Sequence, residues 1–186
     1  MRPLQRADAS AWARLHRESR EWLTPWEATL PEGSLPGAAS FRQMVRGLRA
    51  QARDGRSLPF VTTYDGQMVG QVTVSGVTWG SARWAQVGYW IDRSHAGRGI
   101  TPIAVAMVVD HCLSAVGLHR IEIAIRPENV ASLAIVHKLG LRQVGLAPKY
   151  LHIDGAWRDH LLFAVTAEEA PRGLLARLLE QPADQA

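Results

Sequence analysis

Hydrophobic residues follow a helical spacing early in the chain and a strand pattern in its middle. In residues 40–54 they recur at intervals of three and four, as on one face of a helix: Phe41, Met44, Val45 and Leu48. After residue 58 the pattern changes to two strand-like runs. These runs are joined by Asp65-Gly66, a strong signal for a two-residue hairpin turn. The middle of the chain is therefore predicted to be a β-meander.

The same reasoning along the whole chain predicts strands alternating with helices. The predicted strands are residues 2–6, 58–64, 67–77, 82–91, 121–125, 141–146 and 157–165. The predicted helices are residues 9–22, 40–54, 101–116 and 131–139, with a short amphipathic stretch at 174–179. Residues 31–37, with two prolines and two glycines, are predicted to be an exposed loop. This order indicates a mixed α/β fold with helices on both faces of one sheet.

A length of 186 residues suits one domain, which we expect to cover residues 1–166 and to be followed by a tail at 167–186. The single Cys112 lies among apolar neighbours on a predicted helix, which indicates a core position and a reducing, cytoplasmic setting. The N-terminus lacks the apolar stretch of a signal peptide, and no run is long enough to span a membrane. We therefore expect no membrane partner.

The charge pattern favours a small anionic ligand over a nucleic acid. The formal net charge is +4 and the sequence pI is about 9.8, but the arginines are scattered along the chain. We therefore expect no nucleic-acid partner, although a basic surface attracts an anionic cofactor. The seven histidines and Cys112 do not show the spacing of metal ligands, so we expect no metal.

The segment Gly97-Arg98-Gly99-Ile100-Thr101 lies between a predicted strand and a predicted helix. Glycines let the backbone approach a ligand closely, and the free amides and dipole of a helix start attract phosphate oxygens. Arg98 can add a charged donor. A plain glycine turn would have the same sequence, whereas the dinucleotide-binding and P-loop patterns are absent. The segment is therefore a candidate phosphate site.

The residues around this segment resemble the GNAT N-acetyltransferase superfamily. Ala96 to Thr101 is similar to its motif Arg/Gln-x-x-Gly-x-Gly/Ala, with Ala96 and Thr101 as departures. Residues 126–132 and 138–141 are similar to the family's second motif, Asn-x-x-Ser followed by Lys-Leu-Gly-Phe. Residues 22–27 and 155–160 look like the branch that acetylates the N-terminal alanine or serine of ribosomal proteins. The resemblance covers residues 1–166.

The resemblance implies a mostly antiparallel, twisted sheet in which strands four and five splay apart, with acetyl-CoA in the gap. The amine would attack the thioester directly, without a covalent enzyme intermediate. The implied cofactor-binding residues are Tyr89, Trp90, Ile91, Gly97, Arg98, Gly99, Ile100, Thr101, Asn129 and Ser132.

The groups that move protons are less well defined by the resemblance. Many relatives protonate the thiolate with a tyrosine where this chain has Val136, and Ser132, one helical turn earlier, is the nearest substitute. Ser132 could equally be a helix-capping residue. The candidate general bases are Glu27, His152 and Asp159, or a chain of water molecules, and we take Glu27 as the candidate catalytic residue with Ser132.

The acceptor is expected to bind near Trp22, Trp26, Glu27 and Tyr150, although the two tryptophans could instead serve packing. The preferred hypothesis is an N-terminal protein acetyltransferase. The alternatives are an acyltransferase for a small amine or for a longer acyl-CoA, and a non-catalytic CoA-binding regulatory domain. The sequence leaves open whether the protein is a monomer or a homodimer.

Overall fold

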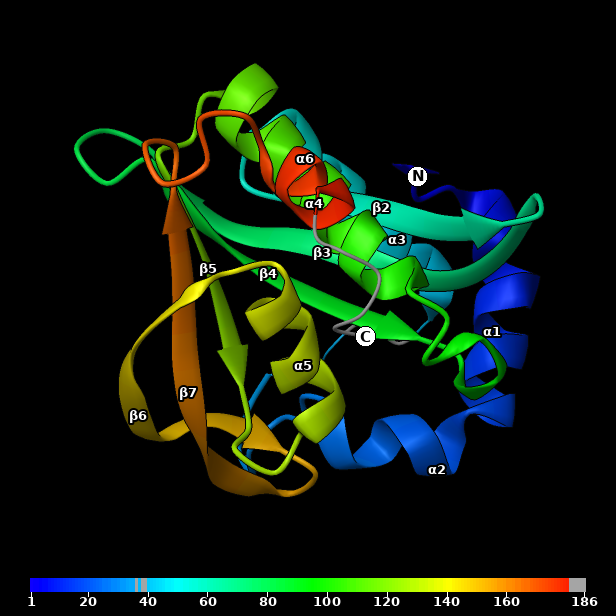
Figure 1. Ribbon diagram of the computed structural model, residues 1–186. Helices are drawn as coiled ribbons and strands as arrows, with labels where there is room; N and C mark the ends of the chain where they lie inside the picture. Colours follow the sequence, from blue (N-terminus) through cyan, green and yellow to red (C-terminus); the bar gives the residue numbers. More distant parts are fainter. Residues whose placement is uncertain (36, 38–39, 181–186) are drawn as a thin grey trace.

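The computed structural model describes residues 1–35, 37 and 40–180, which form one seven-stranded sheet with helices on both faces (Figure 1). The strand order is β1-β2-β3-β4-β5-β7-β6, in which β4 and β5 are parallel and all other neighbours are antiparallel. The strands are β1 (Arg2–Pro3), β2 (Leu58–Tyr64), β3 (Gln67–Thr78), β4 (Trp84–Ile91), β5 (Arg120–Ile125), β6 (Arg142–Ile153) and β7 (Ala156–Thr166). The predicted mixed α/β class is confirmed.

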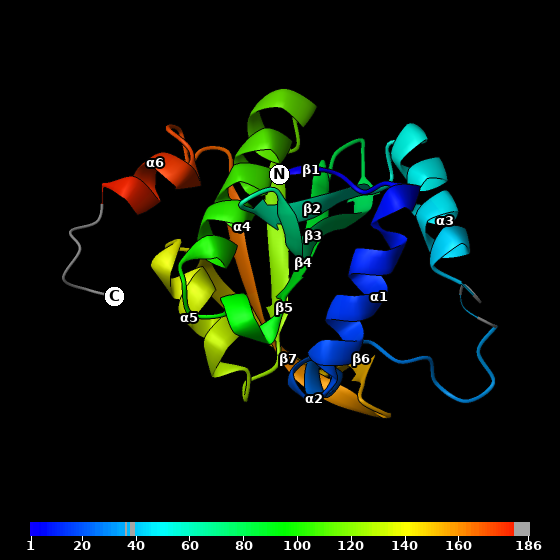
Figure 2. The same cartoon turned by 90° about the vertical axis from the view of Figure 1, so that its right-hand side faces the viewer.

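Two groups of helices cover the sheet. One face carries α1 (Ala9–Glu18), α2 (Arg20–Leu23) and α3 (Phe41–Arg53), and the other carries α4 (Ile100–His111), α5 (Val130–Lys138) and α6 (Leu174–Leu179), as Figure 2 shows. Short 3-10 turns precede α1 (η1, Arg6–Asp8), follow α2 (η2, Thr24–Trp26) and precede α4 (η3, Arg93–His95), and a π-helical turn, η4 (Cys112–Val116), extends α4.

The larger core lies between the sheet and α4, α5 and α6. Val105, Ile121 and Phe163 are almost fully buried there, and α6 adds Leu174. Helix α4 is apolar around most of its circumference because it packs between the sheet and α6. Cys112 is part of this core, as expected, and burial raises the pKa of its thiol to about 12, which keeps it protonated.

The splay between strands four and five is confirmed. Strands β4 and β5 pair only where Trp84, Ala85 and Gln86 lie opposite Arg120, Ile121 and Glu122. Beyond Gln86 the remainder of β4 still pairs with β3, while the remainder of β5 pairs with β7. A gap therefore opens between the carboxyl-terminal halves of β4 and β5.

Three predicted elements differ from the structure. The strand predicted at residues 2–6 covers only Arg2–Pro3, and Arg6 begins the 3-10 turn η1. The helix predicted at 9–22 breaks at Ser19, whose φ of −103° and ψ of 16° are not helical. The strand predicted to end at residue 146 continues to Ile153, because β6 tolerates Pro148 in a bulge opposite β7. Pro36 of the predicted loop lies outside the described residues. None of the helices in the described ranges is long and apolar enough to cross a membrane.

Candidate active site

The gap between β4 and β5 exposes one side of the β4 backbone. In an antiparallel strand, successive residues point their amide and carbonyl to opposite sides. The Asp92 amide donates to the Val69 carbonyl at 2.8 Å, so Ile91 and Tyr89 direct their polar groups away from β3. These groups face the gap, whereas those of Trp90 face β3. Of the three residues predicted to hold pantetheine, Tyr89 and Ile91 have the backbone orientation for it.

The glycine segment lies at the end of this gap and opens α4. Gly97 and Gly99 have φ values of 74° and 73°, in the left-handed region that favours glycine. No other atom lies within 4 Å of where a Cβ would stand at either residue, so the backbone is open to a ligand. Gly99 is the N-cap of α4 and supplies no side-chain cap, which leaves the first amides of α4 available.

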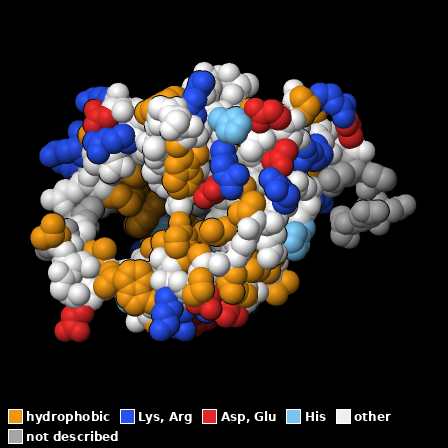
Figure 3. All heavy atoms as spheres, turned by 90° about the vertical axis from the view of Figure 1, so that its left-hand side faces the viewer, with side chains coloured by type: hydrophobic (Ala, Val, Ile, Leu, Met, Phe, Trp, Pro, Cys, Tyr) orange, Lys and Arg blue, Asp and Glu red, His pale blue; other side chains and the backbone are white. Residues whose placement is uncertain are grey.

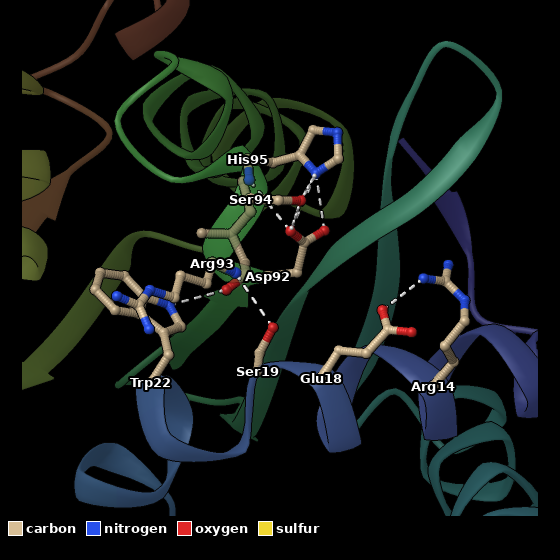
Figure 4. A network of polar contacts seen from close by, with 9 residues as sticks. Arg14, Glu18, Ser19, Trp22, Asp92, Arg93, Ser94 and His95 are labelled. Atoms are coloured by element: carbon tan, nitrogen blue, oxygen red, sulfur yellow. Dashed lines mark hydrogen bonds and ion pairs between the residues drawn. The ribbon is translucent and has the colours of Figure 1, made fainter.

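Asp92 fixes the chain just before the glycines, as Figure 4 shows. Its carboxylate accepts hydrogen bonds from the Ser94 hydroxyl (2.6 Å) and from Nδ1 of His95 (2.9 Å). Burial opposes the ionisation of Asp92, but these hydrogen bonds outweigh it and hold its pKa below the ordinary value. The Ser19 hydroxyl also accepts from the Arg93 amide at 3.2 Å, which ties this turn to the end of α1. These contacts hold the chain at the entrance to the glycine segment.

The Arg98 side chain is engaged elsewhere. Its guanidinium lies 4.7 Å from the centre of the Tyr64 ring and donates to the Tyr64 hydroxyl at 3.3 Å. Both residues line a pocket of about 870 Å³ between α1, the β2–β3 turn and η3. A contact between Arg98 and phosphate, expected from the sequence, stays a prediction. Ile100 and Thr101 form the first turn of α4, where Thr101 is buried.

Helix α5 begins at the opposite side of the gap. Asn129 caps it, because its Oδ1 accepts from the Ser132 amide at 3.1 Å, so its NH₂ group is left to donate. The Ser132 hydroxyl takes part in no hydrogen bond among the described residues. Val136, where many relatives have a tyrosine, is fully buried.

Tyr89 brings a phenol to the start of α5. Its hydroxyl donates to the Ser132 carbonyl at 3.3 Å. Burial raises the pKa of this phenol above its ordinary value, so the hydroxyl stays protonated. The resemblance implies a role only for the backbone of Tyr89, whereas in the structure its hydroxyl lies beside Ser132.

Residues Trp22 to Glu27, here called the bridging segment, join the two separated strands. The Trp22 indole N–H donates to the Ile91 carbonyl at the end of β4, at 3.2 Å (Figure 4). Just beyond β5, Arg126 donates to the Pro25 carbonyl at 2.8 Å and lies 5.3 Å from the centre of the Trp26 ring. The Asp154 amide, at the β6–β7 turn, donates to the Glu27 carbonyl at 3.1 Å. The bridging segment is therefore anchored to three parts of the sheet.

Glu27 is held at the end of the bridging segment by His16 of α1. The His16 Nδ1 lies 3.1 Å from Oε1 of Glu27. The His16 ring stacks on Trp12 at 3.7 Å between centroids and meets Trp90 edge-on at 4.5 Å. This burial lowers the pKa of His16, although the charge and hydrogen bond of Glu27 oppose the shift. A neutral His16 donates from Nδ1, since an ionised carboxylate only accepts.

The other predicted bases have structural partners. The His152 Nδ1 lies 2.8 Å from the Thr29 hydroxyl, and Asp159 accepts from the Lys149 amide at 2.8 Å within the β6 bulge. Asp159 is exposed, and its carboxylate is already engaged by this backbone amide. Glu27 remains as a half-exposed carboxylate on the bridging segment, which contacts the ends of β4 and β5.

Tyr150, a predicted acceptor-binding residue, lies on β6 and contacts β4. Its hydroxyl accepts from the Gln86 side chain of β4 at 2.7 Å, so β6 bends towards β4 on the face that carries α1. Figure 3 views the side where β5, β7 and β6 lie and shows a hollow beside a cluster of hydrophobic side chains. The exposed hydrophobic residues of β6 and β7 are Val144, Leu146, Leu151 and Trp157. Within the described ranges, no group of three His, Cys, Asp or Glu side chains could hold a metal.

A gap between β4 and β5, with a glycine-opened helix at its end, defines a class of protein. The family described as "Acetyltransferase (GNAT) domain" matches residues 1–142. The chain belongs to this family and is an acetyltransferase.

Relatives within the family narrow the comparison. The chain is 47% identical to the Mycobacterium smegmatis RimJ structure in complex with CoA-disulfide, with a TM-score of 0.89 over 96% of this chain and 86% of that one. It is 30% identical to a ribosomal-protein-S5-alanine acetyltransferase from Vibrio fischeri, with a TM-score of 0.79 over 89% and 91% of the two chains. It is also 29% identical to the ribosomal protein uS5-alanine N-acetyltransferase of Escherichia coli, over 87% and 85% of the two chains.

Sequence reasoning missed three groups that the structure brings to the site. His16 and Arg126 hold the bridging segment, and the Tyr89 phenol reaches α5. The sequence does hint at the Tyr89 phenol, because Tyr89 and Ile91 are two residues apart on β4, the strand beside the gap. His16 had a weaker signal, since a histidine four residues after Trp12 lies on the same helical face.

Proposed function

We propose that this chain is an acetyl-CoA-dependent N-acetyltransferase whose acceptor is the N-terminal alanine or serine of a ribosomal protein. The observation that supports acetyl-CoA as the acyl donor is the β4–β5 gap, with the glycine segment and the start of α4 at its end. The acceptor is supported by the similarity to relatives described as alanine acetyltransferases of a ribosomal protein. We also infer that the reaction takes place in the cytoplasm.

Acetyl-CoA would lie along this gap in extended form. The pyrophosphate would lie against the amides from Gly97 to Thr101, where the helix dipole and free N–H groups favour anions. Pantetheine would pair with the backbone of Tyr89 and Ile91, and the NH₂ group of Asn129 would donate to its carbonyl from the other side. This arrangement directs the thioester towards the first turn of α5.

The acceptor amine would approach from the bridging segment. Its nitrogen attacks the thioester carbonyl carbon, the new C–N bond forms, and the C–S bond then breaks. The proton that the amine loses would go to the Glu27 carboxylate, either directly or through water. In the ground state the same carboxylate would attract the ammonium form of the acceptor.

The departing thiolate needs a proton, for which Ser132 and Tyr89 are the candidates. Both hydroxyls belong to the first turn of α5 or touch it. Because Ser132 has no side-chain partner among the described residues, its hydroxyl is free to turn towards sulfur. Tyr89 would reach sulfur only by leaving the Ser132 carbonyl.

Ser132→Ala is expected to lower turnover by about tenfold to a hundredfold while leaving acetyl-CoA affinity within about twofold, because a positioned acid acts mainly in the transition state. The rate of thiol release measures turnover, and calorimetry measures acetyl-CoA affinity. Tyr89→Phe is the matched variant: it removes one hydroxyl and keeps the ring. If Tyr89→Phe lowers the rate and Ser132→Ala does not, the proton comes from the phenol and Ser132 is removed from the mechanism.

The acceptor class is tested with short peptides that begin with alanine or serine. Acetylation of these peptides, together with loss of acetylation on ribosomal-protein N-termini in a strain lacking the chain, is the expected result. Faster acetylation of a small amine such as a polyamine would favour the small-molecule alternative. Binding of acetyl-CoA without thiol release on any amine would favour a regulatory CoA-binding domain.

A further inference from the structure

Helix α3 carries a row of arginines along its outer side. Arg42, Arg46, Arg49 and Arg53 are spaced by four, three and four residues, which places them within an arc of about 60° on an α-helix. At 1.5 Å per residue, the row is roughly 16 Å long. Arg6 of η1 joins it, because a hollow of about 290 Å³ is lined by Arg6, Arg46, Arg49 and Arg53. The scattered arginines of the sequence are thus brought together on one face.

Within the described residues, no acidic side chain forms an ion pair with this arginine row. All five side chains are exposed. Helix α3 contains no acidic residue. The nearest acidic residues in sequence have other partners, since Asp8 pairs with Arg2 and Asp54 with Arg56. Five uncompensated charges exceed the +4 net charge of the whole chain, so the excess charge is concentrated here.

The opposite side of α3 is used to hold the helix. Val45 is fully buried, and Phe41, Met44 and Leu48 pack against the smaller core with Leu15 and Val61. No apolar face of α3 is left to enter a membrane, which an interfacial helix requires. The arginines therefore lie on a helix that is packed firmly against the core, and the exposed side of α3 offers a partner positive charge and no apolar surface.

We propose that the arginine row docks the phosphate backbone of RNA, which reverses the expectation from the sequence of no nucleic-acid partner. A single phosphate would engage one or two guanidinium groups, whereas a row of about 16 Å fits a chain of successive phosphates. Arginine, present at every charged position of α3, binds phosphate oxygens in a bidentate manner. The choice of RNA rests on the proposed function, because a ribosomal protein that serves as acceptor is bound to RNA in the ribosome. Helix α3 lies on the same face of the sheet as α1 and α2, where the bridging segment receives the acceptor (Figure 2).

The test is fluorescence anisotropy with a fluorescein-labelled oligouridylate as the probe. With four to five phosphate contacts, the logarithm of the binding constant is expected to fall with the logarithm of salt concentration with a slope of about −3. Arg46→Gln with Arg49→Gln should make this slope shallower by about 1.4 and weaken binding at about 50 mM salt by tenfold or more. Both residues are exposed, so the thermal midpoint should not change.

The control removes the same charge from the opposite face. Arg142 and Arg172, near α6, are each paired with a glutamate, and Arg142→Gln with Arg172→Gln is expected to leave RNA binding within about twofold. Equal losses in the two double variants, or no binding at low salt, would overturn the proposal. Preferential binding to phosphatidylglycerol vesicles, or equal competition by polyglutamate, would overturn it in favour of a membrane or an acidic protein.

Acetylation of a free alanine peptide, measured on the same preparations, separates this inference from the proposed function. The Arg46 and Arg49 double variant should acetylate the peptide at the rate of the unmodified protein. A protein that binds RNA through the row but acetylates no peptide would refute the proposed acceptor and leave the docking surface standing.

Discussion

A tryptophan in place of Gly99 is expected to abolish acetyl-CoA binding. Gly99 is the N-cap of α4, and the open space above it is where the pyrophosphate would meet the first amides of the helix. An indole there occupies that space and covers the amides. Calorimetry should show a loss of affinity of at least a hundredfold. Unchanged affinity would remove the phosphates from this segment.

Backbone strain must be separated from steric blocking, because Gly99 has a φ of 73°. Gly80, in the β3–β4 turn, has the same φ and also has no atom within 4 Å of its Cβ position. It lies at the opposite end of β4 from the glycine segment. Gly80→Trp therefore carries a comparable strain, estimated at about 1–2 kcal/mol, and should keep full acetyl-CoA affinity.

Removing the carboxylate of Glu27 should give the second large effect. Glu27→Gln is expected to lower kcat/KM for the acceptor peptide by about a hundredfold, because an amide neither accepts the amine proton nor attracts the ammonium. Acetyl-CoA affinity should not change. Steady-state kinetics with the peptide as the varied substrate measure the first effect, and calorimetry measures the second.

His16→Phe tests how Glu27 is held. Phenylalanine keeps an aromatic ring between Trp12 and Trp90 but cannot donate to Glu27. The expected loss in kcat/KM is about tenfold, and the double variant should lose no more than Glu27→Gln alone, because both changes act through one carboxylate. Additive losses would show that His16 acts independently of Glu27.

The free energy of unfolding distinguishes this role of His16 from a purely structural one, because loss of a structural residue would lower it. The His16 Nε2 is buried without a partner in the described part of the chain, and such a group costs about 1–3 kcal/mol. His16→Phe should therefore leave the free energy of unfolding equal or higher while activity falls. In Glu27→Gln the pKa of His16, followed by NMR, should fall further, because Glu27 is the group that raises it.

Much of the fold could be predicted because local signals agree with it. The strand at residues 58–64 has the predicted bounds, since the Asp65-Gly66 turn fixes where it ends. The face formed by Phe41, Met44, Val45 and Leu48 is the face of α3 that packs against the core. The glycine segment was recognisable because its conformational requirement is local.

The arrangement of the site depends on contacts between residues far apart in sequence. Trp22 and Ile91 are 69 positions apart, and Pro25 and Arg126 are 101 apart. Neither contact leaves a periodic pattern in the chain. The end of β6 was mispredicted for a related reason, since Pro148 reads as a strand breaker and only the pairing with β7 shows that a bulge absorbs it.

The hydrogen bond from Trp22 to the Ile91 carbonyl has a consequence for how the two substrates would influence each other. Ile91 belongs to the strand that would carry the donor, while Trp22 belongs to the segment that would receive the acceptor. In the proposed function the two half-sites would share this contact, and binding at one would then alter affinity at the other. Binding of one substrate would strengthen or weaken the Trp22–Ile91 contact and so change the surface that the other substrate meets. Cooperativity between donor and acceptor would then arise within a single subunit.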